Sequence, residues 1–503
     1  MVGREAPTLP KLRSDWASTG NTKSGWPQFL EAVQLHGLRG WTGQQIELRF
    51  PVVAIAGENG SGKSTILKAA AAAYKPSGKS SDVTVRDFSP DDFFPSTPWE
   101  NVSGVRLEYR VRRGDDVGNH SLRKASARWR GMPERPQRQM YFLDISRTQP
   151  VDTLIGYGKV ARVELATNAS AININADYLG ILSRVLGRSY KAGSLVRDAR
   201  GKQVGIVEFE GNTYSNFHQG AGEDATTDLM ALLQDAPRHS LILIDEVEAS
   251  LHPRAQRRLM TELIKLAADR RLQLVVTTHS PYVLEQLPAE ARIYLRTTRD
   301  GLREPIYGVT PDYALSLMDD ESHPELYLYC EDDRAVPLIE GMIRATDPAL
   351  IARVKVVPVG PAGTVRMLGS LMSEDRLPEQ GLGVLDADQP AAPGCVRLPG
   401  PAKPPEVALF GAMEEANFVS IAERLGVRAG DLMDAVEDAC RLPEHHTWTK
   451  RTAEGLGGTM RTAKVWEAFT DVWIKDVLSE ADRMAFMEAI TSRLPQVGAS
   501  GAA

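Results

Sequence analysis

A glycine-rich loop at residues 57–64 has the spacing of a phosphate-binding site. It reads GENGSGKS and fits the pattern G-x-x-x-x-G-K-[ST], with an apolar strand before it and an Ala-rich helix after it. Glycines let successive backbone N–H groups approach phosphate oxygens, and the following helix adds the positive end of its dipole. We expect Lys63 to contact the β- and γ-phosphates of ATP and Ser64 to offer its hydroxyl to Mg²⁺. The residues predicted to bind nucleotide here are Asn59, Gly60, Ser61, Gly62, Lys63, Ser64 and Thr65.

A second apolar strand ends in two adjacent acids that could complete this chemistry. The segment LILIDEVE places Asp245 where it can hold the water shell of Mg²⁺ and Glu246 where it can polarise an attacking water. Unpaired charge at a buried strand end is costly, so function explains the pair better than packing does. The next apolar strand, LQLVVTTH, ends in His279, and the dipeptide Ser-Pro follows it. A lone histidine there would be a capping or core residue, but after the Asp-Glu strand we predict a γ-phosphate contact.

Three further carboxylates follow apolar strands in the second half of the chain. Glu331 ends the strand in YLYCEDD, and Asp386 and Asp388 end the strand in GVLDADQ. Because the carboxyl ends of parallel strands meet at one edge of a sheet, the three acids could meet there. Oxygen ligands suit Mg²⁺ or Mn²⁺, so we predict that these acids bind a metal and take part in catalysis. The alternative is that each is a solvated acid at a strand end.

The elements that must position these residues alternate between strand and helix. Fully apolar strands separated by helices predict buried parallel sheets, hence an α/β fold. Short alternating runs between residues 80 and 165, QMYFLDI among them, predict antiparallel additions, and 389–405 reads as a loop. Residues 1–27 are polar, with Pro and Gly, and predict a loose leader. We expect an ATPase domain over 28–318, a smaller α/β domain over 324–425 and a helical region over 426–503.

Composition excludes several classes of protein. The 503 residues are 42% hydrophobic and 25% charged, which is ordinary for a globular protein. There is no secretory signal and no apolar run long enough to span a bilayer, and the three cysteines lack metal spacing, so we expect a cytoplasmic protein without a membrane partner. The net charge of −6 argues against a dedicated nucleic-acid coat. The stretch Arg106–Arg138 is nevertheless basic, and it is either a solvated hairpin face or a DNA contact.

Around the phosphate-binding loop the chain resembles the ABC ATPase heads of the RecF, SMC and OLD (overcoming lysogenization defect) group. Gln219–Glu223, QGAGE, stands where that group has its S-x-G-E signature. Gly220 occupies the serine position, so the match rests on Gly222 and Glu223. In such heads the signature of one protomer caps the ATP bound to the other. The resemblance therefore implies that Gly222 and Glu223 bind nucleotide in a homodimer of heads, with higher oligomers possible.

Two other segments fit the same resemblance. Ala249–Pro253, ASLHP, looks like the D-loop of the OLD branch, where Leu-His-Pro is typical. Gln149 is a candidate for the Q-loop glutamine. The lack of a membrane domain in this sequence argues against a transporter head, and the lack of a long coiled-coil insertion argues against an SMC protein.

The order of Glu331, a strand with a glycine turn, and then Asp-x-Asp resembles a Toprim domain. An ABC head followed by Toprim is the OLD layout. OLD nucleases also use a downstream lysine, for which Lys450 in HHTWTKR is the best candidate, although His445 and His446 before it could equally be packing residues. The departures are Asp332, where Toprim usually has Gly, and Ala335, where OLD enzymes often carry a second acid. Asp333 or Glu406 could replace that acid.

The resemblance implies ATP-controlled DNA cleavage, with phosphodiester nicking by a Mg²⁺ or Mn²⁺ site in the Toprim-like domain. It also implies a role in antiviral defence, because the Gabija and PARIS phage-defence systems contain related parts. The alternative is an ATPase sensor or scaffold whose degenerate Toprim-like domain holds and releases a protein effector, such as a toxin or nuclease. Asp332 and Ala335 favour the scaffold, and the intact Asp-x-Asp favours the nuclease.

Overall fold

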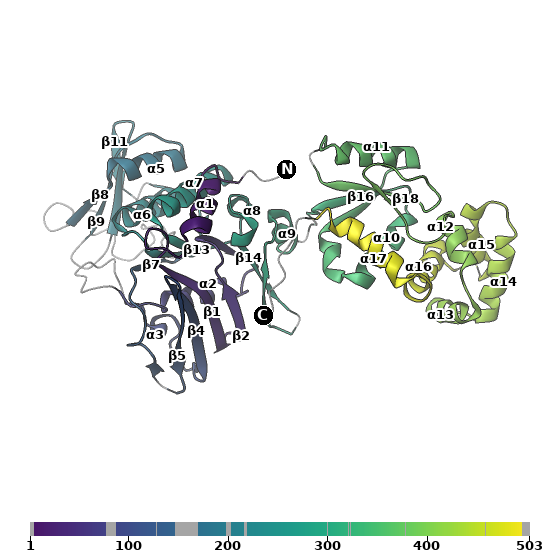
Figure 1. Ribbon diagram of the computed structural model, residues 1–503, viewed down its shortest axis with the longest axis horizontal. Helices are drawn as coiled ribbons and strands as arrows, with labels where there is room; N and C mark the ends of the chain where they lie inside the picture. The colour runs from purple at the N-terminus through teal and green to yellow at the C-terminus, as the bar shows by residue number, and fades with distance from the viewer. Residues whose placement is uncertain are drawn as a thin grey trace. The chain divides into compact units, whose positions relative to one another are not determined.

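The computed structural model describes residues 5–76, 87–126, 128–145, 170–197, 203–215, 219–298, 300–319, 321, 323–377, 379–457 and 459–494. The chain forms two compact units, the first comprising residues up to Met318 and the second beginning at Asp319 (Figure 1). Among the described helices, none combines the length and apolar character needed to cross a membrane.

A six-stranded sheet in the first unit carries the phosphate-binding loop. Its strands are β3 (Val52–Ala56), β7 (Met140–Leu143), β12 (Leu241–Ile244), β13 (Gln273–Thr278), β14 (Arg292–Thr297) and β15 (Arg303–Tyr307). The order is β15-β14-β3-β13-β12-β7, and every neighbouring pair is parallel except β14 and β15. Every residue of β3, β12 and β13 is buried, which explains their nearly unbroken apolar sequences and confirms the predicted parallel arrangement.

The strand β7 was expected in the antiparallel part, and this expectation was wrong. It pairs in parallel with β12 at the edge of the six-stranded sheet. The sequence QMYFLDI is too short to show whether one face or both faces are buried. Met140 and the neighbouring Tyr141 are both buried, as is typical of a strand covered on two sides.

Two antiparallel sheets complete the first unit, and the first of them contains the other antiparallel strands predicted between residues 80 and 165. The strands of one are β1 (Gln28–Leu38), β2 (Trp41–Glu47), β4 (Val105–Arg113), β5 (Asp116–Lys124) and β6 (Trp129–Arg130), in the order β2-β1-β4-β5-β6. Those of the other are β8 (Ser170–Asn173), β9 (Tyr190–Arg197), β10 (Gln203–Phe209) and β11 (Asn212–Ser215), in the order β11-β10-β9-β8. Every pairing within these sheets is antiparallel.

The helices of the first unit join these sheets. They are α1 (Leu9–Thr19), α2 (Lys63–Ala71), α3 (Pro90–Phe93), α5 (Ala176–Leu186), α6 (Ala221–Asp235), α7 (Pro253–Arg270), α8 (Pro281–Leu284) and α9 (Pro311–Ser316), with a 3₁₀ turn at Ala289–Ala291. The helix α2 contacts β13 of the six-stranded sheet and β1 of the antiparallel sheet. Its alanines suit this position, because they allow both sheets to approach closely. Figure 1 shows α5 beside β8 and β9, and α5 also packs on α6 and α7.

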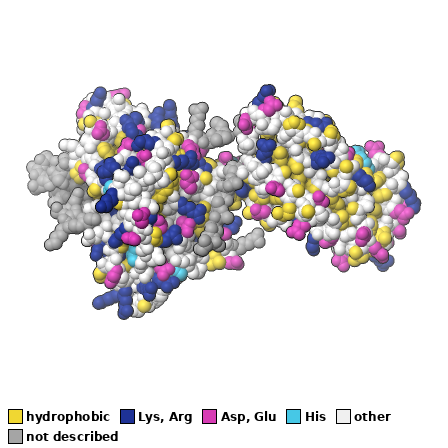
Figure 2. Space-filling model, viewed as in Figure 1, with side chains coloured by type: hydrophobic (Ala, Val, Ile, Leu, Met, Phe, Trp, Pro, Cys, Tyr) yellow, Lys and Arg dark blue, Asp and Glu magenta, His cyan; other side chains and the backbone are white. Residues whose placement is uncertain are grey.

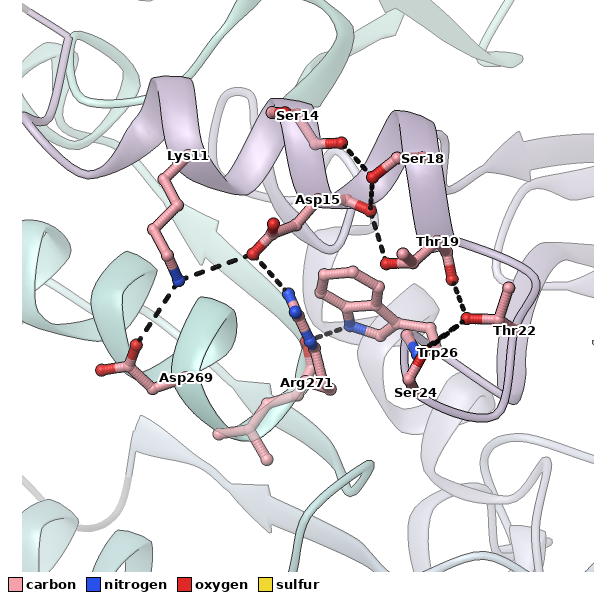
Figure 3. A network of polar contacts seen from close by, with 12 residues as sticks. Lys11, Ser14, Asp15, Ser18, Thr19, Thr22, Ser24, Trp26, Asp269 and Arg271 are labelled. Carbon is pink, nitrogen blue, oxygen red and sulfur yellow. Dashed lines mark hydrogen bonds and ion pairs between the residues drawn. The ribbon is translucent and has the colours of Figure 1, made fainter.

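The N-terminal segment is a docked helix rather than the loose leader that its composition suggested. The helix α1 packs on α7, and the side chains of Leu12 and Trp26 are fully buried. Trp26 Nε1 donates to the carbonyl of Leu272 at 2.9 Å, and Arg271 donates to Asp15 at 2.7 Å (Figure 3). A short helix needs only a few apolar residues to pack on a domain, so the average polarity of residues 1–27 did not reveal that this segment is docked.

The second unit is built on a parallel sheet. Its strands are β16 (Leu326–Cys330), β17 (Val354–Pro358), β18 (Gly381–Leu385) and β19 (Cys395–Arg397), in the order β17-β16-β18-β19. The strand β19 lies inside the segment 389–405, which was expected to be a loop, and it pairs in parallel with β18. It has three residues only, which is too short for a periodicity to be visible in the sequence.

Helices cover this sheet and continue beyond it. They are α10 (Ala335–Thr346), α11 (Ala362–Ser373), α12 (Pro405–Gly411), α13 (Glu415–Leu425), α14 (Ala429–Cys440), α15 (Trp448–Gly455), α16 (Thr462–Val472) and α17 (Glu480–Thr491), with 3₁₀ turns at Pro348–Ala352 and His445–Thr447 and a π-helical turn at Trp473–Val477. In Figure 1, α11 lies on one side of β16 and β18, and α10 and α17 lie on the other. One hydrophobic core runs from Leu326 of β16 to Leu494, so the sheet and the C-terminal helices share it.

Candidate functional site

The loop between β3 and α2 has the geometry of a phosphate-binding site. Gly62 begins the helix at a φ of 99°, and a Cβ there would lie 2.8 Å from the indole nitrogen of Trp41, so only glycine fits. The ammonium group of Lys63 is folded into the loop, where it donates to the carbonyls of Gly57 at 2.8 Å and Glu58 at 2.9 Å. Burial lowers the pKa of Lys63, and the charges of Glu246 and Asp245 oppose that shift.

The loop also holds an orphaned polar atom. The side chain of Ser61 is buried, and its Oγ has no hydrogen-bond partner within the described part of the chain. A buried hydroxyl normally has a partner, so its isolation fits a loop that closes on phosphate. Asn59 and Gly60 are exposed at the tip, and Thr65 is buried in the first turn of α2. The hydrogen-bond donors of the loop therefore fit the phosphates of a nucleoside triphosphate.

Asp245 is brought to the loop by the strand order. The strand β13 lies between β3 and β12, so the carboxyl ends of these strands share one edge. Ser64 Oγ donates to Asp245 Oδ1 at 3.1 Å, and Thr277 Oγ1 donates to the same oxygen at 2.6 Å. The hydroxyl of Thr277 also accepts from the backbone N–H of Glu246 at 2.8 Å. Thr277 thus orients both acids, and nothing in the spacing of the sequence identified it.

Glu246 follows the strand β12 in a left-handed backbone conformation. Its φ is +47°, which is unusual for a residue other than glycine. Such a conformation costs free energy and persists where the surrounding contacts impose it, often at functional sites. The charge of Glu246 acts on Lys63, so this acid lies near the phosphate-binding loop, and its role as a catalytic base stays a prediction.

His279 lies beside the same loop. Burial, followed by the positive charge of Lys63, lowers the pKa of His279. A neutral imidazole at this position can hydrogen-bond to a phosphate oxygen without adding a charge. Its backbone N–H donates to Glu248 Oε1 at 2.6 Å, and burial raises the pKa of Glu248. Glu248 is a second residue that sequence reasoning missed, although it stands two positions after Glu246.

The segment predicted to carry the signature forms a separate pocket with the predicted D-loop. Gly222 lies in the first turn of α6, where a Cβ would be 2.3 Å from the carbonyl of Ser250. Glu223 accepts hydrogen bonds from the hydroxyls of Tyr190 and Tyr214. These residues line a pocket of about 530 Å³ together with Leu186, Arg188, Gly220, Ala221, Leu251, His252 and Ala255. The predicted contact of Gly222 and Glu223 with nucleotide would require a second protomer and stays a prediction.

In the second unit, Glu331 and Asp386 meet at the carboxyl edge of the sheet. The strands β16 and β18 are neighbours, and Glu331 accepts from the N–H of Asp386 at 3.3 Å and from the N–H of Ala362 at 3.1 Å. Burial, followed by the charge of Glu331, raises the pKa of Asp386 to about 7. Burial also raises the pKa of Glu331. Such half-buried, repelling carboxylates are a suitable donor set for a hard divalent cation.

Asp388 and Lys450 take less part in this arrangement. Asp388 is exposed, and the oxygens of Glu331, Asp386 and Asp388 do not all come within 4.8 Å of one another. Lys450 lies on α15, and its side chain is 72% exposed. Its Nζ is 4.0 Å from Oε1 of Glu454 on the same helix. The structure therefore joins Glu331 and Asp386, and the charge of Asp388 still acts on both of them.

Glu406, one of the acids that could replace the missing carboxylate at Ala335, already has ionic partners. Glu406 is buried and pairs with Arg334 and with His446. Ala335 is buried at the start of α10. Glu406 contributes to the raised pKa of Asp386, so it lies near the carboxylates, but its charge is already balanced.

Much of the basic stretch Arg106–Arg138 serves the fold. Arg112 is buried and donates to Glu31 at 3.1 Å. The buried residues Lys124, Arg135 and Arg138 have partners too, in Asp91, Asp87 and Gln273 respectively. On the visible face of the first unit, Lys and Arg are interspersed with Asp and Glu (Figure 2). The solvated or structural interpretation is therefore favoured over a continuous DNA-binding face. The proposed Q-loop residue Gln149 lies outside the described residues.

Two protein-family models match the first unit. Residues 32–147 match a model described as an AAA domain. Residues 226–285 match a model described as "AAA domain, putative AbiEii toxin, Type IV TA system". The matched segments include the phosphate-binding loop, Asp245, Glu246 and His279. Both descriptions name an AAA domain, so these two segments of the chain are similar to AAA-type ATPase domains. No curated protein sequence matches the chain.

Among solved structures, the chain is similar to SMC head domains. The head with an extended coiled coil bound to the C-terminal domain of ScpA, from Pyrococcus furiosus, aligns at 13% identity with a TM-score of 0.37, covering 55% of this chain and 96% of that one. The SMC head domain from Thermotoga maritima aligns at 16% identity with a TM-score of 0.30, covering 55% and 98%. These scores are low, so the description of the first unit rests on its own topology.

Proposed function

We propose that the first unit binds and hydrolyses Mg²⁺-ATP. The observation that carries this proposal is the convergence of Ser64 and Thr277 on Asp245 beside the phosphate-binding loop. Lys63 and the backbone N–H groups of the loop would hold the phosphates, and Ser64 and Asp245 would hold Mg²⁺. The cation supplies charge stabilisation at the transferred phosphoryl group. Glu246 takes the proton of the attacking water, and His279 donates a hydrogen bond to the γ-phosphate.

The test is steady-state ATP hydrolysis by the wild type and by Glu246→Gln. The amide is nearly isosteric but cannot accept the proton, so we expect nucleotide binding to persist while turnover falls by at least about 100-fold. A variant that hydrolyses ATP at the wild-type rate would show that another group is the base. Glu285→Gln is a matched control, because Glu285 pairs with Arg257 on the protein surface.

ATP binding further joins two heads in a homodimer, with the pocket around Gly222 and Glu223 facing the nucleotide of the other protomer. What supports this is the close packing of Gly222 against Ser250, which brings the segment that resembles the signature beside the segment that resembles the D-loop. Light scattering of Glu246→Gln with and without ATP tests the idea. We expect the mass to double with ATP, and a monomer in both conditions would refute it.

For the second unit we propose a Toprim-like, OLD-type site that nicks DNA with Mg²⁺ or Mn²⁺. The supporting observation is the joining of Glu331 and Asp386 at one sheet edge, with the pKa of Asp386 raised to about 7. These carboxylates would hold a cation that orients a phosphodiester and lowers the pKa of an attacking water. Plasmid relaxation by the wild type and by Asp386→Ala tests this. We expect slow, Mn²⁺-favoured nicking that is lost in the variant while ATP hydrolysis continues.

A second candidate is a scaffold that holds a protein effector and releases it when ATP is hydrolysed. Two observations favour this alternative. The side chains of Lys450 and Asp388 are exposed, which weakens the case for catalysis. Arg112 pairs with Glu31 inside the protein, which weakens the case for DNA binding. The description of one matching family mentions a toxin of a type IV TA system, which suits a toxin as the effector of such a scaffold. Absence of cleavage by the wild type with either metal, while ATP is hydrolysed, would decide for the scaffold.

A further inference from the structure

One carboxylate and two imidazole side chains lie close together in the second unit. Glu406 lies in the first turn of α12, and His445 and His446 form the 3₁₀ turn that leads into α15. One ligand atom from each lies within 4.8 Å of the other two, and no other group of this kind occurs within the described ranges. In Figure 2, histidine side chains reach the surface of this unit over the part that Figure 1 labels α12 and α15.

The surroundings of these side chains are unusual for residues that only pack. The side chain of Glu406 is 3% exposed, and its Oε1 lies 3.0 Å from Nδ1 of His446. The two imidazole rings are perpendicular, with centroids 4.1 Å apart. Nδ1 of His445 is shielded from solvent and has no hydrogen-bond partner within the described part of the chain. A buried nitrogen without a partner is costly, and a metal ion would satisfy it.

We propose that Glu406, His445 and His446 form a binding site for a divalent transition metal of the Zn²⁺ class. Two imidazoles and one carboxylate are ligands that Zn²⁺ accepts readily, whereas Mg²⁺ prefers oxygen ligands only. The fourth position is open to water, since His446 is largely exposed. The site uses other ligands than the neighbouring carboxylates Glu331 and Asp386, although the charge of Glu406 contributes to the raised pKa of Asp386. It does not depend on the function proposed for them.

Arg334 competes with the metal for the same carboxylate. Its guanidinium pairs with Glu406 and at the same time lies over the Trp466 ring, 5.9 Å from the centroid, a contact that does not depend on Glu406. Both cations cannot share one buried oxygen without repulsion, so metal binding moves the guanidinium away from Glu406. This arrangement explains how a buried glutamate remains neutralised when no metal is bound.

The experiment is a Zn²⁺ titration of the full-length protein by calorimetry, after EDTA treatment and with excess Mg²⁺ to occupy oxygen-ligand sites. We expect one Zn²⁺ per chain in the wild type, and visible d–d absorption when Co²⁺ is added instead. Loss of a ligand should weaken binding by at least about tenfold in His445→Ala and in His446→Ala. The matched control is His323→Ala, because His323 pairs with Asp319 and belongs to the same unit. Thermal unfolding must show that each variant is folded.

Arg334→Gln provides a test that does not remove a ligand. If the metal and the guanidinium compete, this variant should bind Zn²⁺ more tightly than the wild type, by about tenfold or more. If Glu406 serves the fold alone, the variant should lose stability and gain no affinity. The proposal is overturned if the wild type binds no more Zn²⁺ than the double variant of His445 and His446, or if Arg334→Gln leaves the affinity unchanged.

Discussion

The hydroxyl of Thr277 lies 2.6 Å from Asp245 Oδ1 and donates to it, while accepting from the backbone N–H of Glu246 at 2.8 Å. One side chain on the middle strand therefore fixes both acids of the neighbouring strand. Because the carboxylates must hold their positions during hydrolysis, the alignment of the site depends on this hydroxyl.

Replacing Thr277 with valine should lower the turnover of ATP by about 10–100-fold, as is usual for residues that orient a metal ligand or base. Nucleotide affinity should change little, since Thr277 makes its two contacts with Asp245 and Glu246 rather than with the loop. Turnover and nucleotide affinity are measured separately, and Thr277→Ser should restore activity. Wild-type turnover in the valine variant would contradict the positioning role.

Lys63→Ala should abolish tight ATP binding. Loss of a charged hydrogen-bond donor costs about 2–3 kcal/mol, which corresponds to roughly 30–150-fold in affinity. The measurement is a titration with a fluorescent ATP analogue. Lys68→Ala, one turn further along α2, controls for the loss of a positive charge. Affinities within about twofold of the wild type for Lys63→Ala would refute the assignment of the loop.

The raised pKa of Asp386 predicts a stability that falls as pH rises. Folded Asp386 keeps its proton up to about pH 7, whereas the unfolded chain releases it near pH ~4. The folded state thus binds more protons between these values, so the free energy of unfolding decreases across that window. Allowing for partial exposure, the contribution is of the order of 1–3 kcal/mol. Denaturant unfolding in EDTA between pH 5 and pH 8 measures it.

Asp386→Asn provides the comparison, because the amide has no proton to release in this window. We expect the variant to be more stable than the wild type at pH 8 and to show a flatter pH dependence. Identical pH profiles of the two proteins would mean that Asp386 titrates normally.

The docked helix α1 should contribute to the stability of the first unit. Leu12 is fully buried, so Leu12→Ala should lower the free energy of unfolding by about 2–5 kcal/mol. Lys11→Ala on the same helix should change it by less than ~0.5 kcal/mol, because Lys11 is exposed and makes surface ion pairs only. Equal effects of the two substitutions would argue against docking of α1 in solution.

The sequence by itself determined the nucleotide site in its essentials. The loop from Gly57 to Ser64 is local, its strand and helix are marked by apolar runs and alanines, and Asp245 and Glu246 directly follow a buried strand. These features depend on neighbours within a few positions, so periodicity and spacing were sufficient to predict them. The parallel strands β3, β12, β13, β16, β17 and β18 and the carboxylates Glu331 and Asp386 were predictable for the same reason, whereas the parallel strands β7 and β19 were not.

The tertiary structure alone decided which distant residues complete each site. Ser64 and Asp245 are 181 positions apart, and Thr277 reaches Asp245 only because β13 lies between β3 and β12. Strand order depends on the packing of the whole sheet, and no local pattern encodes it. The same holds for Glu406, whose partners Arg334 and His446 come from elements 72 and 40 positions away. A buried charge takes its partner from whichever element the fold places beside it, and only the folded chain reveals that choice.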